Sequence, residues 1–131
     1  MSGMRVLAAE DNELNAEILE AILEMRNASC VICENGRLAL NAFLQSDPGQ
    51  YDLILMDVQM PVMNGYEATR AIRDSNHPSA ATIPIIAMTA NAFTEDIQAS
   101  LDAGMNAHIS KPIDLDALEQ TVRRVMIRKP V

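Results

Sequence analysis

The sequence is poor in aromatic residues, in positive charge and in long apolar runs. Only 3% of its 131 residues are aromatic, and tryptophan is absent. With 10 Lys and Arg against 18 Asp and Glu, the formal net charge is -8, so the chain lacks the clustered positive charge that binds nucleic-acid backbones. No apolar run approaches the roughly 20 residues of a membrane-spanning helix, and the N-terminus lacks an apolar signal stretch. We therefore expect a cytoplasmic domain that contacts neither nucleic acid nor membrane directly.

Cysteine is also scarce, but the two cysteines form a C-x-x-C pattern, Cys30-Val31-Ile32-Cys33, of the kind found in redox and zinc sites. The surrounding run Ser29 to Cys33 is typical of a strand, in which side chains three positions apart point to opposite faces. A zinc site also needs about four ligands, and the only histidines are His77 and His108. We interpret the cysteines as small residues in or near the core.

The chain does contain a regular alternation of short β-type runs and helical patterns. Its length, with 49% hydrophobic and 21% charged residues, suits one globular domain over residues 1–131. The expected strands are Arg5 to Ala9, Ser29 to Cys33, Leu53 to Met56, Ile85 to Met88 and Ala107 to Ser110. This alternation predicts an α/β fold with a doubly wound, five-stranded parallel sheet, (βα)5. A second methionine directly before the first strand suggests that residues 1–4 are an added segment.

Helical patterns fill the gaps between these strands. The first helix is indicated by a stripe at helical spacing that consists of Leu14, Ile18, Ile22 and Met25. Asn64, with Glu67 three residues later, predicts a capping box at the start of the third helix. Gly104 suits the end of the fourth helix.

Polar residues follow the ends of the apolar strands. Glu10 and Asp11 follow the first strand, Asp57 the third, Thr89 the fourth, and Lys111 comes directly after the fifth. Ligands of a doubly wound sheet bind outside the carboxyl ends of its strands, so we expect these groups to meet at one edge. Alternatively, the Glu10-Asp11 pair caps the helix that follows.

Several carboxylates in one place repel each other unless a cation lies among them. Mg²⁺ suits such a site because it uses few carboxylates, keeps waters and contacts phosphate oxygens. An opposing Lys and a hydroxyl would then surround a phosphoryl group during transfer. Asp57 is the predicted nucleophile, because it ends the run Leu53 to Met56, which is typical of a buried central strand.

Four segments in order carry a resemblance to a known family. They are LAAEDN at residues 7–12, DLILMDVQMPVMNG at 52–65, PIIAMTANA at 84–92 and GMNAHISKP at 104–112. From Arg5 to Met126 the sequence resembles the receiver domains of two-component response regulators, especially those of hybrid sensor histidine kinases. The resemblance implies a flavodoxin-like fold with strand order 2-1-3-4-5.

The resemblance also implies the roles of individual residues. Asp57 would be the phosphoacceptor, with Thr89 hydrogen-bonded to the phosphoryl group and Lys111 paired with it. The implied Mg²⁺ ligands are Glu10, Asp11, Asp57 and the backbone carbonyl of Gln59. The Lys111-Pro112 bond is expected to be cis, and Gln59 and Asn91 would tune the lifetime of the phosphate. His108 stands where many receivers have Tyr or Phe, so the family's aromatic switch is altered here.

The predicted function is that of a phosphoacceptor in a phosphorelay. Asp57 would take a phosphoryl group from a phosphohistidine of a histidine kinase or a histidine phosphotransfer domain, with Mg²⁺, and the domain would change conformation. It is not expected to be an enzyme beyond self-dephosphorylation. One alternative is an aspartyl-phosphate hydrolase, which would need an acid at position 59, where Gln59 stands. Another is a receiver that only binds partners, against which the intact polar residues at the strand ends argue.

The sequence leaves the context of the domain open. The chain could act as a stand-alone regulator or as the receiver of a hybrid histidine kinase, including the cytosolic part of a membrane-bound sensor. A weak dimer is also left open.

Overall fold

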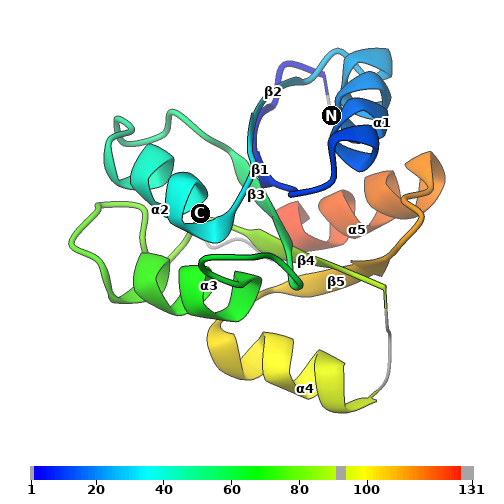
Figure 1. Ribbon diagram of the computed structural model, residues 1–131. Coiled ribbons are helices and arrows are strands. Elements are labelled where there is room, and N and C mark those ends of the chain that lie inside the picture. Colours follow the sequence, from blue (N-terminus) through cyan, green and yellow to red (C-terminus); the bar gives the residue numbers. More distant parts are fainter. Residues whose placement is uncertain (1, 91–93, 128–131) are drawn as a thin grey trace.

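The computed structural model describes residues 2–90 and 94–127, which form an alternating α/β domain (Figure 1). The strands are β1 (Arg5–Ala9), β2 (Ser29–Cys33), β3 (Leu53–Asp57), β4 (Ile85–Thr89) and β5 (Ala107–Ser110). The helices are α1 (Glu13–Met25), α2 (Gly36–Leu44), α3 (Gly65–Asp74), α4 (Thr94–Ala103) and α5 (Leu115–Ile127). All five predicted strands are present, and β3 and β4 each extend one residue further, to Asp57 and Thr89.

The five strands form one parallel sheet in the order β2-β1-β3-β4-β5, as the resemblance implied. Every residue of β3 and β4 is buried, because these strands lie inside the sheet and helices cover both faces. Helices α1 and α5 lie on one face, and α2, α3 and α4 lie on the other (Figure 1). Parallel strands connected in this way bring all their carboxyl ends to the same edge.

Alternation along the strands divides the core into two layers. In β1, Val6 and Ala8 pack in the cluster with α1 and α5, whereas Leu7 and Ala9 pack in the cluster with α2 and α3. The cysteines of β2 follow the same rule: Cys30 packs against the first cluster and Cys33 against the second. Both thiols are free and half-buried. The interpretation as small near-core residues is therefore confirmed.

The helix boundaries follow local hydrogen bonding. The predicted capping box is present: the Glu67 N–H donates to Asn64 Oδ1 at 2.9 Å, and the Asn64 N–H donates to Glu67 Oε1 at 3.1 Å. Gly104 follows the last residue of α4 with φ +108°, as predicted for a helix C-terminus. The cap of α1 is Asn12, whose Oδ1 accepts from the Asn15 N–H at 3.0 Å. The α1 cap thus leaves the side chains of the preceding acidic pair available for another role.

The apolar stripe predicted for α1 does not coincide with the buried face of this helix. The fully buried residues of α1 are Leu19 and Leu23, whereas Leu14 is 64% and Ile18 44% exposed. Met25 is exposed as well. The predicted stripe therefore lies largely on the solvent side of α1, because this helix carries apolar residues on more than its buried face.

Residues near the N-terminus contact the domain. The Gly3 N–H donates to the Asn27 carbonyl at 3.0 Å, the Met4 carbonyl accepts from the Ser29 N–H at 2.9 Å, and the Met4 side chain packs against the core of α1 and α5. That residues 1–4 are an added segment stays a prediction. None of the helices in residues 2–90 and 94–127 is long and apolar enough to cross a bilayer.

The half-buried Arg73 joins three parts of the fold near the amino ends of β4 and β5. Its guanidinium donates to the carbonyls of Gly104, Ala80 and Ile83 and to Asn106 Oδ1, over distances of 2.7 to 3.1 Å. Asn106 Oδ1 also accepts from the backbone N–H of Ile85 at 2.8 Å. Burial lowers the pKa of the guanidinium below its usual value, but the charge persists because that value is so high.

Arg73→Lys is expected to lower the free energy of unfolding by about 1 to 3 kcal/mol, because one ammonium group cannot reach all of these acceptors. The matched control is Arg70→Lys, on an exposed position of the same helix. Denaturant titration measures both. Equal stability of the two variants would show that the hydrogen bonds of Arg73 contribute nothing net.

Candidate functional site

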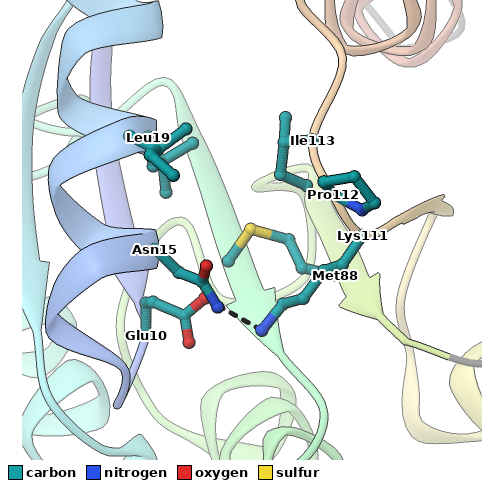
Figure 2. Close-up of a pocket in the computed structure, with 8 residues that line it drawn as sticks. Glu10, Asn15, Leu19, Met88, Lys111, Pro112 and Ile113 are labelled. Atoms are coloured by element: carbon teal, nitrogen blue, oxygen red, sulfur yellow. Dashed lines mark ion pairs between the residues drawn. The ribbon is translucent and has the colours of Figure 1, made fainter.

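Three of the predicted residues are in direct contact at the carboxyl edge of the sheet. Lys111 Nζ lies 2.8 Å from Glu10 Oε1 and 2.9 Å from Asp57 Oδ2. Glu10 is only 4% and Asp57 3% exposed, so one ammonium group bridges two buried carboxyl groups. Figure 2 shows Lys111 extending toward Glu10, with the ion pair drawn as a dashed line. The strand order explains the contact, because β1 and β4 both neighbour β3, and β5 neighbours β4.

Close backbone packing holds Asp57 at the end of β3. The Val58 N–H donates to the Met88 carbonyl at 3.1 Å, and the Gly65 N–H donates to the Val58 carbonyl at 3.0 Å. The segment that follows Asp57 therefore returns to the strand end before α3 begins. A Cβ at Gly65 would collide with the Asp57 carbonyl, so only glycine fits there.

Asp11 adds a third carboxylate to the two buried ones. Glu10, Asp11 and Asp57 each offer an oxygen, and these oxygens lie within 4.8 Å of one another. Asp11 is exposed, whereas the other two residues are buried. Only oxygen donors are present, which is the ligand type that Mg²⁺ and other hard divalent cations prefer. The residues therefore fit a small divalent cation open to solvent on one side.

The proximity of these groups changes their acidity. Burial, together with the hydrogen bond and charge of Glu10, raises the pKa of Asp57 from 3.8 to about 7. Burial alone would raise the pKa of Glu10, but its hydrogen bonds with Asp57 and Lys111 bring it below the usual value. Burial likewise opposes charge on Lys111, yet its two carboxyl partners raise its pKa. The cluster thus has one carboxyl group that ionises reluctantly unless more positive charge arrives.

Thr89 and Gln59 adjoin this cluster. Thr89 is buried at the end of β4, and its carbonyl accepts from the backbone N–H of Lys111 at 2.8 Å. Gln59, two residues after Asp57, has an exposed side chain. The Lys111-Pro112 bond is cis, as the resemblance implied. Asn91 lies outside the described residues.

His108 is half-buried in β5, opposite Ala87 of β4. Its neighbours Ala107 and Ile109 pack against the cluster of α1 and α5, so the alternation of the strand directs His108 to the other face, where α4 lies. The imidazole therefore does not join the three carboxylates.

A small pocket beside the cluster was not predicted from the sequence. It lies between α1 and the segment after β5, and its lining residues include Glu10, Ile18, Lys111, Pro112 and Ile113 (Figure 2). The pocket therefore combines one acidic and one basic side chain with several apolar ones. The only signal in the sequence was the α1 stripe, which contains Ile18 but does not reveal which side faces the sheet.

Comparison with known proteins identifies close relatives. A family model described as the response regulator receiver domain matches residues 6–123. The chain is 40% identical over 119 residues to the sensor histidine kinase GacS of Pseudomonas protegens, covering 90% of this chain and 13% of that protein. It is 37% identical over 124 residues to hybrid signal transduction histidine kinase I of Dictyostelium discoideum, covering 93% of this chain and 7% of that protein. The chain spans only 5% to 15% of the length of such curated relatives.

Solved structures agree in fold. The receiver domain of sensor histidine kinase PA1611 from Pseudomonas aeruginosa, with a magnesium ion coordinated in its active site cleft, has a TM-score of 0.84 and 35% identity over 95% of this chain and 98% of that chain. A match to the co-crystal structure of the Saccharomyces cerevisiae phosphotransfer protein Ypd1 with the receiver domain of Ssk1 has a TM-score of 0.82 and 30% identity, covering 98% and 92%.

The raised pKa of Asp57 predicts how stability depends on pH in the absence of divalent cations. Between about pH 4 and 7, Asp57 binds fewer protons in the unfolded chain than in the folded one, so its contribution to stability falls as the pH rises and the full cost is present above about 7. Asp57→Asn is therefore expected to raise the free energy of unfolding by about 1 to 3 kcal/mol near pH 8, and by much less near pH 4.

Thermal or denaturant unfolding with a chelator present measures this difference. The control is Asp47→Asn, an exposed aspartate in the turn after α2, for which we expect little change at either pH. A variant at Asp57 that is less stable than the wild type near pH 8 would contradict the assignment of the costly carboxylate to this residue.

Proposed function

The chain belongs to the response regulator receiver domain family, and we propose that Asp57 is the residue of this receiver that accepts the phosphoryl group. The contact of Lys111 Nζ with both Asp57 and Glu10 supports this role most directly. It puts a fixed positive charge beside the one carboxylate that ends a central strand. Transfer of a phosphoryl group depends mainly on positioning and on neutralising charge, so this is the arrangement that the reaction needs.

The proposed step transfers the phosphoryl group from nitrogen to oxygen. A carboxylate oxygen of Asp57 forms a bond to phosphorus, while the bond from phosphorus to the donor's histidine nitrogen breaks and its electron pair returns to the imidazole. In this proposal Lys111 stabilises the negative charge on the transferring group, and the hydroxyl of Thr89 donates a hydrogen bond to it. In this step Lys111 exchanges its contact with Asp57 for one with the phosphoryl oxygens and keeps its contact with Glu10.

Magnesium is the cation we assign to the three carboxylates. Glu10, Asp11 and Asp57 would hold it, with the carbonyl of Gln59 as a further ligand, and it would neutralise charge on the phosphoryl oxygens. A magnesium ion lies in the corresponding cleft of the PA1611 receiver structure. The amide at Gln59 also argues against a hydrolase, because a hydrolytic site would use an acid at that position.

The donor is proposed to be a histidine kinase or a histidine phosphotransfer domain. The matched relatives include hybrid histidine kinases, and the Ssk1 receiver was crystallised with the phosphotransfer protein Ypd1. This receiver accepts phosphate but does not itself phosphorylate a substrate, whereas a hybrid parent protein would be a histidine kinase. A place on the cytosolic side of a sensor, without direct contact to nucleic acid or membrane, fits this role.

The exposed apolar residues of α1 give such a donor a surface beside Asp57. Ile18 lines the pocket that also contains Glu10 and Lys111, and Leu14 lies one turn closer to the start of α1. Exposed apolar side chains that lie together and are bordered by polar groups are typical of a protein-binding surface. We propose that the donor covers this face when its phosphohistidine meets Asp57.

Incubation with Mg²⁺ and a small acyl phosphate is expected to add the mass of one phosphoryl group to the wild-type chain. Asp57→Asn should abolish the gain, and Lys111→Met should slow it by about 100-fold or more, because the transferring charge loses its ammonium partner. Intact-mass spectrometry over time measures the rates, with Asp47→Asn as the control. A gain that persists in Asp57→Asn would place the phosphoacceptor elsewhere.

Ile18→Glu is expected to separate the two kinds of donor. Labelling by a small acyl phosphate should stay near the wild-type rate, while transfer from a phosphorylated histidine phosphotransfer domain should slow about tenfold, because a charge enters an apolar contact. The matched control is Leu44→Glu, since Leu44 of α2 is equally exposed, at 44%, on the opposite face of the sheet. Equal slowing in both variants would contradict a specific role of α1.

A further inference from the structure

One residue beside the site has a backbone conformation that its side chain disfavours. Val62, in the segment between β3 and α3, has φ +70°. The Met63 N–H donates to the Pro61 carbonyl at 2.7 Å, so Val62 is the central residue of a γ-turn in its rare, strained form. A positive φ in a β-branched residue is an outlier, because Cβ approaches the backbone too closely.

No other described residue has this kind of backbone strain. The other described residues with positive φ are three glycines and Asn27, which belong to the residue types that tolerate this region. Glycine or asparagine at position 62 would give the same turn with less strain. We therefore look for a benefit that the valine side chain itself provides.

Packing within the domain does not supply that benefit. Val62 is 80% exposed, more than any other large apolar side chain in the described part of the chain. The turn itself is held by backbone contacts on both sides of Val62. The Met63 carbonyl accepts from the Gly36 N–H at 3.1 Å, and the Gly65 N–H donates to the Val58 carbonyl at 3.0 Å. A Cβ at Gly36 would collide with the Met63 carbonyl, so the turn is pressed against the start of α2.

The position of the turn indicates where the side chain acts. Its segment begins directly after Asp57 and ends where α3 starts, so it lies at the carboxyl edge of β3, where the phosphoryl group must arrive. From Val58 to Tyr66 the sequence contains no charged residue, in a chain with a net charge of -8. Depletion of charge and enrichment of Met are features of protein-protein contact surfaces.

We infer that Val62 is a specificity-determining contact of this receiver with its protein phosphodonor, and that the strained turn holds the valine side chain out toward that donor. The inference rests on the proposed transfer from a phosphohistidine to Asp57. It adds a contact on the side of the site opposite α1, formed by the segment after β3. Strained backbone is retained at functional positions when the surrounding structure fixes it, as the contacts of Gly36 and Gly65 do here.

Val62→Asn tests this inference, because asparagine accepts the turn but lacks the apolar side chain. We expect a melting temperature about 2 to 6 °C higher than that of the wild type, as strain is relieved. Labelling of Asp57 by acetyl phosphate with Mg²⁺ should stay within about twofold. Transfer from a phosphorylated histidine phosphotransfer domain should slow about tenfold, and Val62→Ile should retain the wild-type rate.

The protein donor for this experiment is chosen from a small set of phosphorylated phosphotransfer domains that includes Ypd1. The domain that labels the wild type fastest is used. Val31→Asn, at an exposed valine of β2, is the matched control and should not slow transfer. Transfer to Val62→Asn at the wild-type rate would overturn the inference, and so would an equal slowing with acetyl phosphate, which would assign the turn to the active site. If no protein donor labels the wild type while acetyl phosphate does, the proposed donor class and the inference both fail. If acetyl phosphate fails as well, the proposed role of Asp57 is wrong.

Discussion

The site depends on one ammonium group between two buried carboxyl groups. Without Lys111, the side chains of Glu10 and Asp57 would place two acidic groups in an environment from which water is largely excluded, and such burial costs several kcal/mol per unpaired ion. With Lys111, the cluster still holds more negative than positive charge once Asp57 ionises. That imbalance favours a divalent cation, and the cation in turn permits an anionic phosphoryl group to approach. Lys111 thus offsets part of the negative charge of the carboxylates, the cation offsets the rest, and the phosphoryl group brings negative charge to a site where the cation is bound.

The fold meets this electrostatic requirement through the order of its strands. Residues 10, 57 and 111 are far apart along the chain. The parallel sheet brings their strand ends to one edge, and the position of β3 between β1 and β4 makes them neighbours there. Backbone contacts then fix the distances. The absence of a side chain at Gly65 allows the segment after β3 to return onto the Asp57 carbonyl, and Arg73 fixes the opposite ends of β4 and β5.

The sequence predicts those features that depend on local pattern or on strand ends. The five strands, the capping box at Asn64 and the meeting of Glu10, Asp57 and Lys111 all follow from apolar runs and the polar residues after them. The orientation of α1 does not, because Ile18 and Leu19 are both apolar and periodicity cannot choose between faces. Local patterns also do not predict side-chain contacts between residues that are far apart in the sequence. Arg73 reaches Gly104, and His77 lies against the ring of Phe43 at 4.3 Å between centroids, without any sequence signal for either.

Acceptance and readout of the phosphoryl group place different demands on this structure. Acceptance requires the groups that contact Asp57, and these are already assembled. Readout requires movement, which Arg73 and Asn106 oppose at the amino ends of β4 and β5. At the carboxyl end, the backbone N–H of Lys111 donates to the Thr89 carbonyl, which couples β5 to β4 there as well. His108 lies on the α4 face of the same strand, and burying its polar ring more deeply would need a new hydrogen bond. Inward rotation of His108 is therefore the costly part of any readout through β5.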